Sequence, residues 1–124
     1  MNIDSFLDSL KYDQNGLVAA VVQDHASGEV LMVGWMNRKA VRGTLASGRT
    51  CFWSRSRQEY WVKGETSGNI QLVKSVYIDC DRDCVLVKVE QKGPACHENY
   101  RSCFFREVDS DGAVKVTIER MSEG

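Results

Sequence analysis

The sequence predicts an α+β fold: a compact, mainly antiparallel β-sheet with about two short helices, built as one domain over residues 1–124. Three observations lead to this class. Apolar residues recur at helical spacing in only two segments, about eight short segments are rich in β-branched and aromatic residues, and no linker or repeat divides the chain. A chain of 124 residues can bury one core but is too short for two ordinary domains.

The first part of the chain contains both expected helices and a hairpin. Residues 3–10 place apolar side chains at helical spacing, which indicates a short amphipathic helix. Residues 17–24 and 29–36 are apolar, β-prone runs joined by the turn-like sequence HASG, which is typical of a hairpin. Asn37 is a suitable N-cap for a second helix that ends just before Gly48.

Six further strands are expected in the second part of the chain. They are residues 50–56, 59–63, 70–79, 84–91, 102–108 and 113–119. Two of the connections stand out by composition. The loop GETSGN is rich in glycine and hydroxyl groups, and the loop KGPACHENYR holds the only proline and a Cys-His pair.

Charge and composition restrict the class of protein. The net charge of −1 gives no overall attraction to nucleic acid or to an anionic membrane. The N-terminal sequence has neither the basic region nor the apolar run of a secretion signal, and no segment approaches the ~18 apolar residues that span a bilayer. We therefore expect a cytoplasmic protein whose five cysteines, at positions 51, 80, 84, 96 and 103, are metal ligands or buried thiols, not disulfides.

Cys80, Cys96 and Cys103 are candidate zinc ligands. Their spacing matches no common zinc finger, so buried thiols without a metal remain an alternative. The last two bracket the polar loop PACHENYRSC, which offers a thiol little apolar core. Three thiolates would leave the fourth position of a catalytic zinc open for water. His97 could be the fourth ligand, but it follows Cys96 directly and adjacent ligands are geometrically awkward. We therefore interpret it as a proton carrier near that water, the other alternative being a surface histidine.

Asp79, Asp81 and Asp83 alternate with Cys80 and are candidate ligands of a second metal. In an extended strand the three carboxylates would share one face and the thiol would point to the other. Carboxylates suit Mg²⁺ and thiolates suit zinc, so the alternation would sort two metals. The alternative is a solvated acidic turn between two strands. A thiol on the opposite face could also meet Cys96 and Cys103 across a symmetric dimer boundary.

Residues 52–68 combine basic, aromatic and hydroxyl-bearing side chains, as nucleotide sites do. Arginine and glycine-rich loops bind phosphate, and indole rings stack on bases. The candidate substrate-binding residues are Trp53, Arg55, Arg57, Trp61, Lys63, Thr66, Ser67 and Gly68. Two alternatives remain: an exposed strand pair with its tryptophans in the core, and a patch for single-stranded nucleic acid, although Glu59 and Glu65 dilute its charge.

Five segments together resemble the phosphoribosyl-AMP cyclohydrolase family, which carries out the third step of histidine biosynthesis: GWMNRKA, FWSRSR, WVKGETSGNIQ, DCDRDC and QKGPACHENYRSCF. The resemblance runs from about residue 17 to 108. It implies that Cys80, Cys96 and Cys103 bind zinc with ligands from both subunits of an intertwined homodimer, and that Asp79, Asp81 and Asp83 bind Mg²⁺. Two details depart from the family pattern: Cys84 follows the acidic motif where a Thr or another small residue is more usual, and Asn99 stands in a loop that often carries Gly.

The resemblance also implies a substrate and a reaction. The substrate is an adenine nucleotide ribosylated at N1, and a zinc-activated water would open the ring at the N1–C6 bond. Because the sequence ends at Gly124, we expect no fused pyrophosphohydrolase domain. Two other classes compete: a zinc-stabilised module that binds single-stranded nucleic acid without turnover, and a deaminase-type zinc hydrolase. The H-x-E and P-C-x-x-C signatures of the latter are absent from the sequence.

Overall fold

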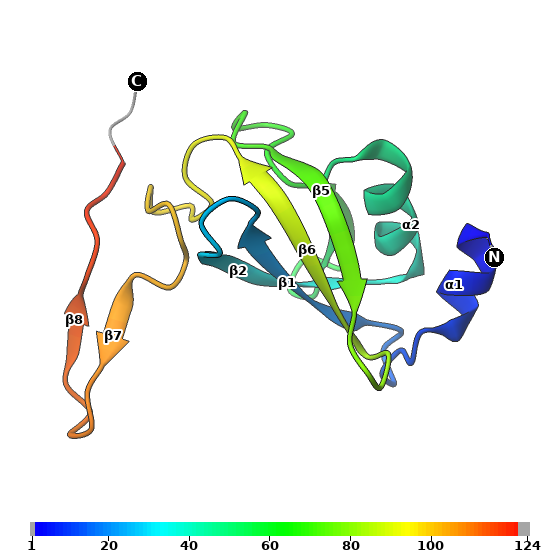
Figure 1. Cartoon of the computed structure of the whole chain (residues 1–124), viewed down its shortest axis with the longest axis horizontal. Helices are drawn as coiled ribbons and strands as arrows, with labels where there is room; N and C mark the ends of the chain where they lie inside the picture. Colours follow the sequence, from blue (N-terminus) through cyan, green and yellow to red (C-terminus); the bar gives the residue numbers. More distant parts are fainter. Residues whose placement is uncertain (1, 122–124) are drawn as a thin grey trace.

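The computed structural model describes residues 2–121 and contains two helices and eight strands in this range (Figure 1). In chain order they are α1 (Ile3–Ser9), β1 (Val18–Asp24), β2 (Val30–Met36), α2 (Arg38–Ser47), β3 (Cys51–Ser54), β4 (Glu59–Val62), β5 (Gln71–Ile78), β6 (Cys84–Gln91), β7 (Arg106–Val108) and β8 (Val114–Val116). The predicted α+β class is confirmed. None of the helices described is long and apolar enough to cross a membrane.

Four strands form the central sheet in the order β2-β1-β6-β5. The pairs β1–β2 and β5–β6 are antiparallel hairpins, whereas β1 and β6 run parallel. The remaining strands form two separate hairpins, β3–β4 and β7–β8. Most pairs are therefore antiparallel, as predicted, but the parallel pair at the centre of the sheet has no counterpart in the local sequence pattern.

Helix α2 begins and ends where its capping residues predict. The side chain of Asn37 accepts a hydrogen bond from the backbone N–H of Ala40 at 2.8 Å, which satisfies one free donor of the first turn. Gly48 follows the last helical residue with φ 73°, the left-handed conformation that glycine adopts without steric cost. Its N–H donates to the carbonyl oxygen of Thr44, which closes the last turn.

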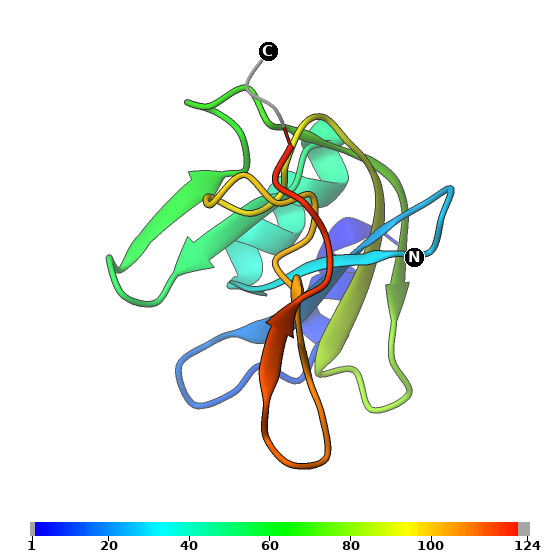
Figure 2. The same cartoon turned by 90° about the vertical axis from the view of Figure 1, so that its left-hand side faces the viewer.

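Both helices and the β3–β4 hairpin cover the same face of the central sheet (Figure 2). Along β1 and β6 every second side chain is buried against them, including Val22 and Val87. The ring of Phe52 on β3 is fully buried and lies against Gly34 of β2, where an added Cβ would come within 2.6 Å of the ring. The absence of a side chain at Gly34 therefore lets β3 pack directly on the sheet.

The opposite face of the sheet is uncovered in the described chain. Val21 pairs with Val33 on β2 and with Leu86 on β6, and Leu86 pairs with Tyr77 on β5, so these side chains share one face. Val33 and Tyr77 are 47% and 51% exposed. We call this surface the open face; it consists of Ala19, Val21, Val33, Trp35, Tyr77 and Leu86.

The two C-terminal strands are shorter than predicted. Residues 102–105 run past the edge of β2 without pairing as a strand: the N–H of Cys103 donates to the carbonyl of Leu31, and the Ser102 hydroxyl donates to that of Val30. Only Arg106–Val108 and Val114–Val116 form a ladder, and this hairpin stands clear of the central sheet (Figure 1). We call residues 106–116 the arm.

A buried polar network joins β5, β6 and the start of β3. Gln71 is fully buried; its amide accepts from the hydroxyl of Thr50 at 2.7 Å and donates to the side-chain oxygen of Gln91 at 2.8 Å. Buried polar groups are stabilising only while their partners remain. The network therefore ties the strand pair to the segment that carries the β3–β4 hairpin.

Replacing Gln71 by Met should lower the free energy of unfolding by about 1–3 kcal/mol, because the buried groups of Thr50 and Gln91 lose their partner. Urea unfolding followed by circular dichroism measures this change. Gln14→Met is the control, since Gln14 is exposed and should change stability by less than about 0.5 kcal/mol. Equal stability of the two variants would contradict the role given to the network.

Candidate active site and metal-binding residues

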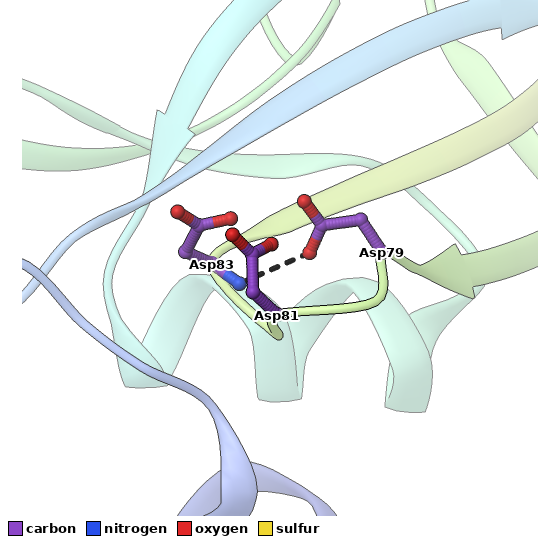
Figure 3. A group of neighbouring side chains, drawn as sticks. All are labelled: Asp79, Asp81 and Asp83. Atoms are coloured by element: carbon purple, nitrogen blue, oxygen red, sulfur yellow. Dashed lines mark hydrogen bonds between the residues drawn. The ribbon is translucent and has the colours of Figure 1, made fainter.

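The three aspartates lie in a turn between β5 and β6, not in a strand (Figure 3). The prediction that strand alternation sorts them from Cys80 was therefore wrong, because residues 79–83 form an exposed turn; that the three carboxylates bind a metal stays a prediction. The Asp79 carboxylate accepts hydrogen bonds from the N–H groups of Asp83 and Cys84, at 3.1 and 3.2 Å. These bonds fold the turn back on itself, and one ligand oxygen from each aspartate lies within 4.8 Å of the other two.

Contact within the cluster shifts the pKa values of Asp79 and Asp83 in opposite directions. Hydrogen bonds with Asp81 and Asp79 raise the pKa of Asp83. Desolvation raises the pKa of Asp79, but hydrogen bonds with the other two carboxyl groups and the backbone outweigh it, so that its pKa is lowered overall. A cluster of this kind retains a proton more readily than separate carboxylates and releases it to a divalent cation. Its oxygen ligands suit Mg²⁺.

Cys96 and Cys103 lie side by side at the two ends of a loop that follows β6. The loop is closed by backbone hydrogen bonds from Ala95 to Arg101 and from Cys96 to Tyr100. Asn99 occupies its tip with φ 68°. Gly and Asn tolerate this left-handed conformation best, so Asn99 suits the tip of the loop.

Three contacts fix this cysteine loop to the rest of the fold. The guanidinium of Arg101 donates to Asp24 at 2.8 Å and to Glu29 at 3.0 Å, on either side of the turn between β1 and β2. The Lys63 ammonium donates to the carbonyl oxygen of Ala95 at 2.6 Å. Hydrogen bonds to charged groups contribute more than neutral ones, so the loop is held in place before any metal binds.

The environment of the Cys103 thiol favours its protonated form. Burial of the sulfur, together with the adjacent Cys96, raises the pKa of Cys103 to about 11, although the residue as a whole is exposed. Burial lowers the pKa of the Lys63 ammonium, while the two thiols oppose that shift. Without a metal, Cys103 is therefore expected to remain a thiol at neutral pH.

Cys80 lies far from the other two candidate zinc ligands. It belongs to the turn before β6, whereas the cysteine loop follows the end of the same strand. A strand of eight residues spans ~26 Å, and no group of three possible ligands within residues 2–121 includes a cysteine. One chain thus brings two of the three predicted thiols together, and leaves the third at the opposite end of the sheet.

The cysteine loop and the β3–β4 hairpin line a single cavity of about 720 Å³. The predicted site residues that line it are Arg57, Trp61, Lys63, Thr66, Ser67, His97 and Cys103. Cys96 is buried beside Cys103, behind the cavity lining. This volume is in the range of sites for small molecules, and its lining combines an indole, hydroxyls, cations and a thiol.

Smaller cavities hold two of the predicted residues, Trp53 and Arg55, and also Trp35, which the sequence analysis did not single out. Arg55 and Trp53 line smaller cavities beside the main one, and the Arg55 guanidinium lies 4.5 Å from the ring of Trp35. Trp35 also lines a cavity with Asp81 and Asp83. The sequence pattern could have identified Trp35, because strand alternation places it on the opposite face of β2 from the buried Met36.

Trp61 has both of the roles that the sequence left open. Its ring stacks on the buried Phe52 with 4.9 Å between centroids, and one side of the same residue lines the main cavity. Gly68 lies at the tip of the neighbouring loop with φ 82° and does not line the cavity. The predicted substrate-binding residues are thus divided among the main cavity, the smaller cavities beside it and the tip of a loop.

Comparison with known proteins identifies the family. A family profile described as phosphoribosyl-AMP cyclohydrolase matches residues 32–105, which include both candidate metal-binding segments and the whole β3–β4 hairpin. The chain belongs to the phosphoribosyl-AMP cyclohydrolase family. It is therefore a hydrolase by family.

Relatives that carry this name match nearly the whole chain. The phosphoribosyl-AMP cyclohydrolase of Pelotomaculum thermopropionicum is 60% identical over 114 residues, which make up 92% of this chain and 88% of that protein. That of Paracoccus denitrificans is 62% identical over 108 residues, or 87% and 89%. That of Chlorobium phaeovibrioides is 52% identical over 112 residues, or 90% and 82%. The similarity to these relatives therefore extends well beyond the five motif-bearing segments.

Cys103 of the metal-free cyclohydrolase should react slowly with iodoacetamide at pH 8. Its raised pKa of about 11 leaves a thiolate fraction ~10²-fold below that of an unperturbed cysteine, and the rate should climb as the pH approaches that value. Mass spectrometry of the alkylated peptide measures the rate, with a short cysteine peptide as reference. A rate equal to that of the peptide at pH 8 would contradict the raised pKa of Cys103.

Proposed function

We propose that this protein hydrolyses phosphoribosyl-AMP, the third step of histidine biosynthesis, by opening its adenine ring. Water adds to C6, the N1–C6 bond breaks, and N1 leaves with a proton. The observation that carries the proposal is the cavity in which the cysteine loop meets the basic, hydroxyl-bearing end of the β3–β4 hairpin. Substitution of N1 makes the ring cationic and C6 electrophilic, so the main requirements are an activated water and a proton carrier.

His97 is the proposed proton carrier. It lines the same cavity as Cys103 and follows Cys96 directly in the sequence, so its imidazole is attached next to the thiol pair. A histidine can take up a proton from water and return it to the departing N1 near neutral pH. Its exposed position permits exchange of that proton with solvent.

Zinc is the proposed metal of the thiols. Cys96 and Cys103 supply two adjacent sulfur ligands, and sulfur is the ligand that zinc prefers over magnesium. Within one chain the donor set is incomplete, so the proposal takes Cys80 from a second copy in a homodimer with shared sites. When bound, zinc supplies the Lewis acidity that makes water nucleophilic at neutral pH.

Asp79, Asp81 and Asp83 are the proposed ligands of Mg²⁺. The three carboxylates converge and are exposed, as a cation that also contacts a phosphate requires. With this turn supplied by the same second copy that provides Cys80, we assign the substrate phosphates to the Mg²⁺ and to the hydroxyls of Thr66 and Ser67 in the cavity, with Gly68 leaving the loop backbone accessible. A cytoplasmic location follows from the reduced thiols that such a zinc site requires.

The cationic and aromatic residues complete the proposed substrate site. Arg57 and Lys63 line the cavity and supply positive charge, although the Lys63 ammonium also holds the carbonyl of Ala95. Arg55 and Trp53 lie beside it, and Trp61 exposes part of its indole to the cavity for stacking on the purine.

Purified protein with Mg²⁺ should open the ring of phosphoribosyl-AMP, and removal of zinc by a chelator should abolish turnover until zinc is restored. An ultraviolet absorbance assay follows the loss of the purine. Ammonia should not be released, because ring opening keeps the exocyclic nitrogen. No turnover by folded, zinc-loaded protein would reject the proposal, and salt-dependent binding of oligonucleotides would then favour the nucleic-acid module.

Substitutions should separate the two metals. Cys103→Ser should lose zinc and activity together, whereas Asp81→Asn should raise the Mg²⁺ concentration needed for half-maximal rate while zinc content stays unchanged. His97→Ala should keep zinc and reduce kcat ~10²-fold or more. Metal analysis and the same absorbance assay provide the readouts. Loss of zinc in Asp81→Asn would show that the sites are not distinct, and a normal rate in His97→Ala would return it to a surface histidine.

A further inference from the structure

A pocket lies on the open face of the sheet beside residues 79–83, which we call the aspartate turn. Trp35 on β2 pairs with Ala19 on β1, and Ala19 pairs with Cys84 on β6, directly after the turn. Paired residues point to the same face of a sheet, so the indole stands at one end of this row and the aspartate turn at the other. The two small side chains between them leave a cavity of about 520 Å³. We call it the aspartate pocket; it is bounded by Lys11, Ala19, Trp35, Asp81, Asp83 and Cys84.

Lys11 supplies the positive charge of the aspartate pocket. It is exposed, and its backbone N–H donates to the carbonyl oxygen of Arg82 at 2.7 Å, which ties this segment to the aspartate turn. The nearby Asp13 carboxylate accepts hydrogen bonds from the N–H groups of Asn15 and Leu17. Within residues 2–121 no ion pair holds the Lys11 ammonium.

The charges around the aspartate pocket match those of a phosphate site. The three carboxylates of the aspartate turn converge at its edge (Figure 3) and have the oxygen ligands that suit a divalent cation. A phosphate is attracted both by a cation held on carboxylates and by an ammonium. Carboxylates and an unpaired ammonium at one cavity therefore favour a phosphate over an uncharged ligand.

Trp35 forms an apolar wall of the aspartate pocket. Its side chain is half-buried, and the guanidinium of Arg55 lies 4.5 Å from its ring. Trp35 borders two cavities, one shared with Arg55 and the other with the aspartates. The contact with Arg55 restricts the ring, while part of the indole stays open to the aspartate pocket. An indole offers a broad apolar surface on which the C–H groups of a sugar can pack.

The substrate of the proposed reaction needs two sites for sugar phosphates. Phosphoribosyl-AMP carries one ribose 5-phosphate on N9 of its purine and a second on N1, so its two phosphates lie on different sides of the ring system. The hydroxyls of Thr66 and Ser67 in the main cavity serve one of them. The other arm requires room for its sugar as well as charge for its phosphate, and the aspartate pocket offers both.

We infer that the aspartate pocket binds one ribose 5-phosphate arm of the substrate, with the Lys11 ammonium donating to the phosphate and the sugar packed on Trp35. The identity of the substrate rests on the proposed function, whereas the composition of the pocket does not. Because the pocket adjoins the turn that carries Cys80, an arm bound here holds the attached purine near the proposed shared zinc site. Lys11 and Trp35 thus bind the substrate without touching the reacting atoms.

Binding of two small probes separates the roles of Lys11 and Trp35. Equilibrium dialysis of zinc-loaded protein with Mg²⁺ measures the dissociation constants of ribose 5-phosphate and of inorganic phosphate. Lys11→Gln should raise both constants about 10-fold, because a charge-assisted hydrogen bond is lost. Trp35→Leu should raise only that of ribose 5-phosphate, by about 5-fold, and Trp35→Phe should restore most of the affinity.

Lys74→Gln is the matched control, because it removes an exposed lysine on β5 that does not border the pocket. It should change neither dissociation constant. Unchanged binding of both probes by Lys11→Gln would overturn the inference. Equal losses of the two probes in Trp35→Leu would remove the sugar from the indole and overturn it as well.

Kinetics with phosphoribosyl-AMP provide a second readout. Lys11→Gln and Trp35→Leu should raise KM by the same factors as the dissociation constant of ribose 5-phosphate, and should lower kcat by less than about two-fold. A binding residue that contacts no reacting atom stabilises the bound substrate and the transition state equally. A fall in kcat at unchanged KM in either variant would contradict this role.

Failure of the pocket and failure of the proposed reaction give different results. Wild-type protein that binds ribose 5-phosphate through Lys11 and Trp35 but does not open the ring of phosphoribosyl-AMP would reject the reaction and leave a sugar-phosphate site. Ring opening with unchanged KM in both variants would reject the aspartate pocket as a substrate site and leave the reaction intact.

Discussion

The two hydrogen-bond ladders of β6 are the constraint on which the rest of the structure depends. The strand is paired along its length with β1 on one side and β5 on the other. Its first residue follows the aspartate turn and its last precedes the cysteine loop. Because an extended, doubly paired strand cannot shorten, the two groups of candidate ligands are held apart by its full length.

The cysteine loop owes its position to charge pairing outside the site. Asp24 is buried at the end of β1. Hydrogen bonds from the N–H groups of Ser27 and Ala26, together with the ion pair to Arg101, stabilise its ionised form. A buried carboxylate with this many donors is a firm anchor for a guanidinium. This ion pair positions the cysteine loop, which forms one wall of the cavity. The packing of β3 on the central sheet positions the β3–β4 hairpin, which forms the other wall.

Sequence reasoning recovered what depends on neighbouring residues and missed what depends on sheet order. The caps Asn37 and Gly48 bound α2 because capping is local. The aspartates converge, but through hydrogen bonds to Asp79 that form a turn, not through strand alternation. The contact of Arg55 with Trp35, and the distance of Cys80 from the cysteine loop, follow from which strands are neighbours, and no local pattern encodes that.

The buried glutamine pair also determines how β5 and β6 align. Gln71 lies directly opposite Gln91 at the end of the hairpin away from the aspartate turn. If the strands slipped by two residues, Gln71 would face Val89, and a fully buried amide would be left among aliphatic side chains. Such a misaligned hairpin is disfavoured by the cost of that unpaired amide. The number of residues in the aspartate turn is thus fixed by a contact at the opposite end of the hairpin. Gln71 therefore helps to specify the fold of a candidate metal-binding segment that it does not contact.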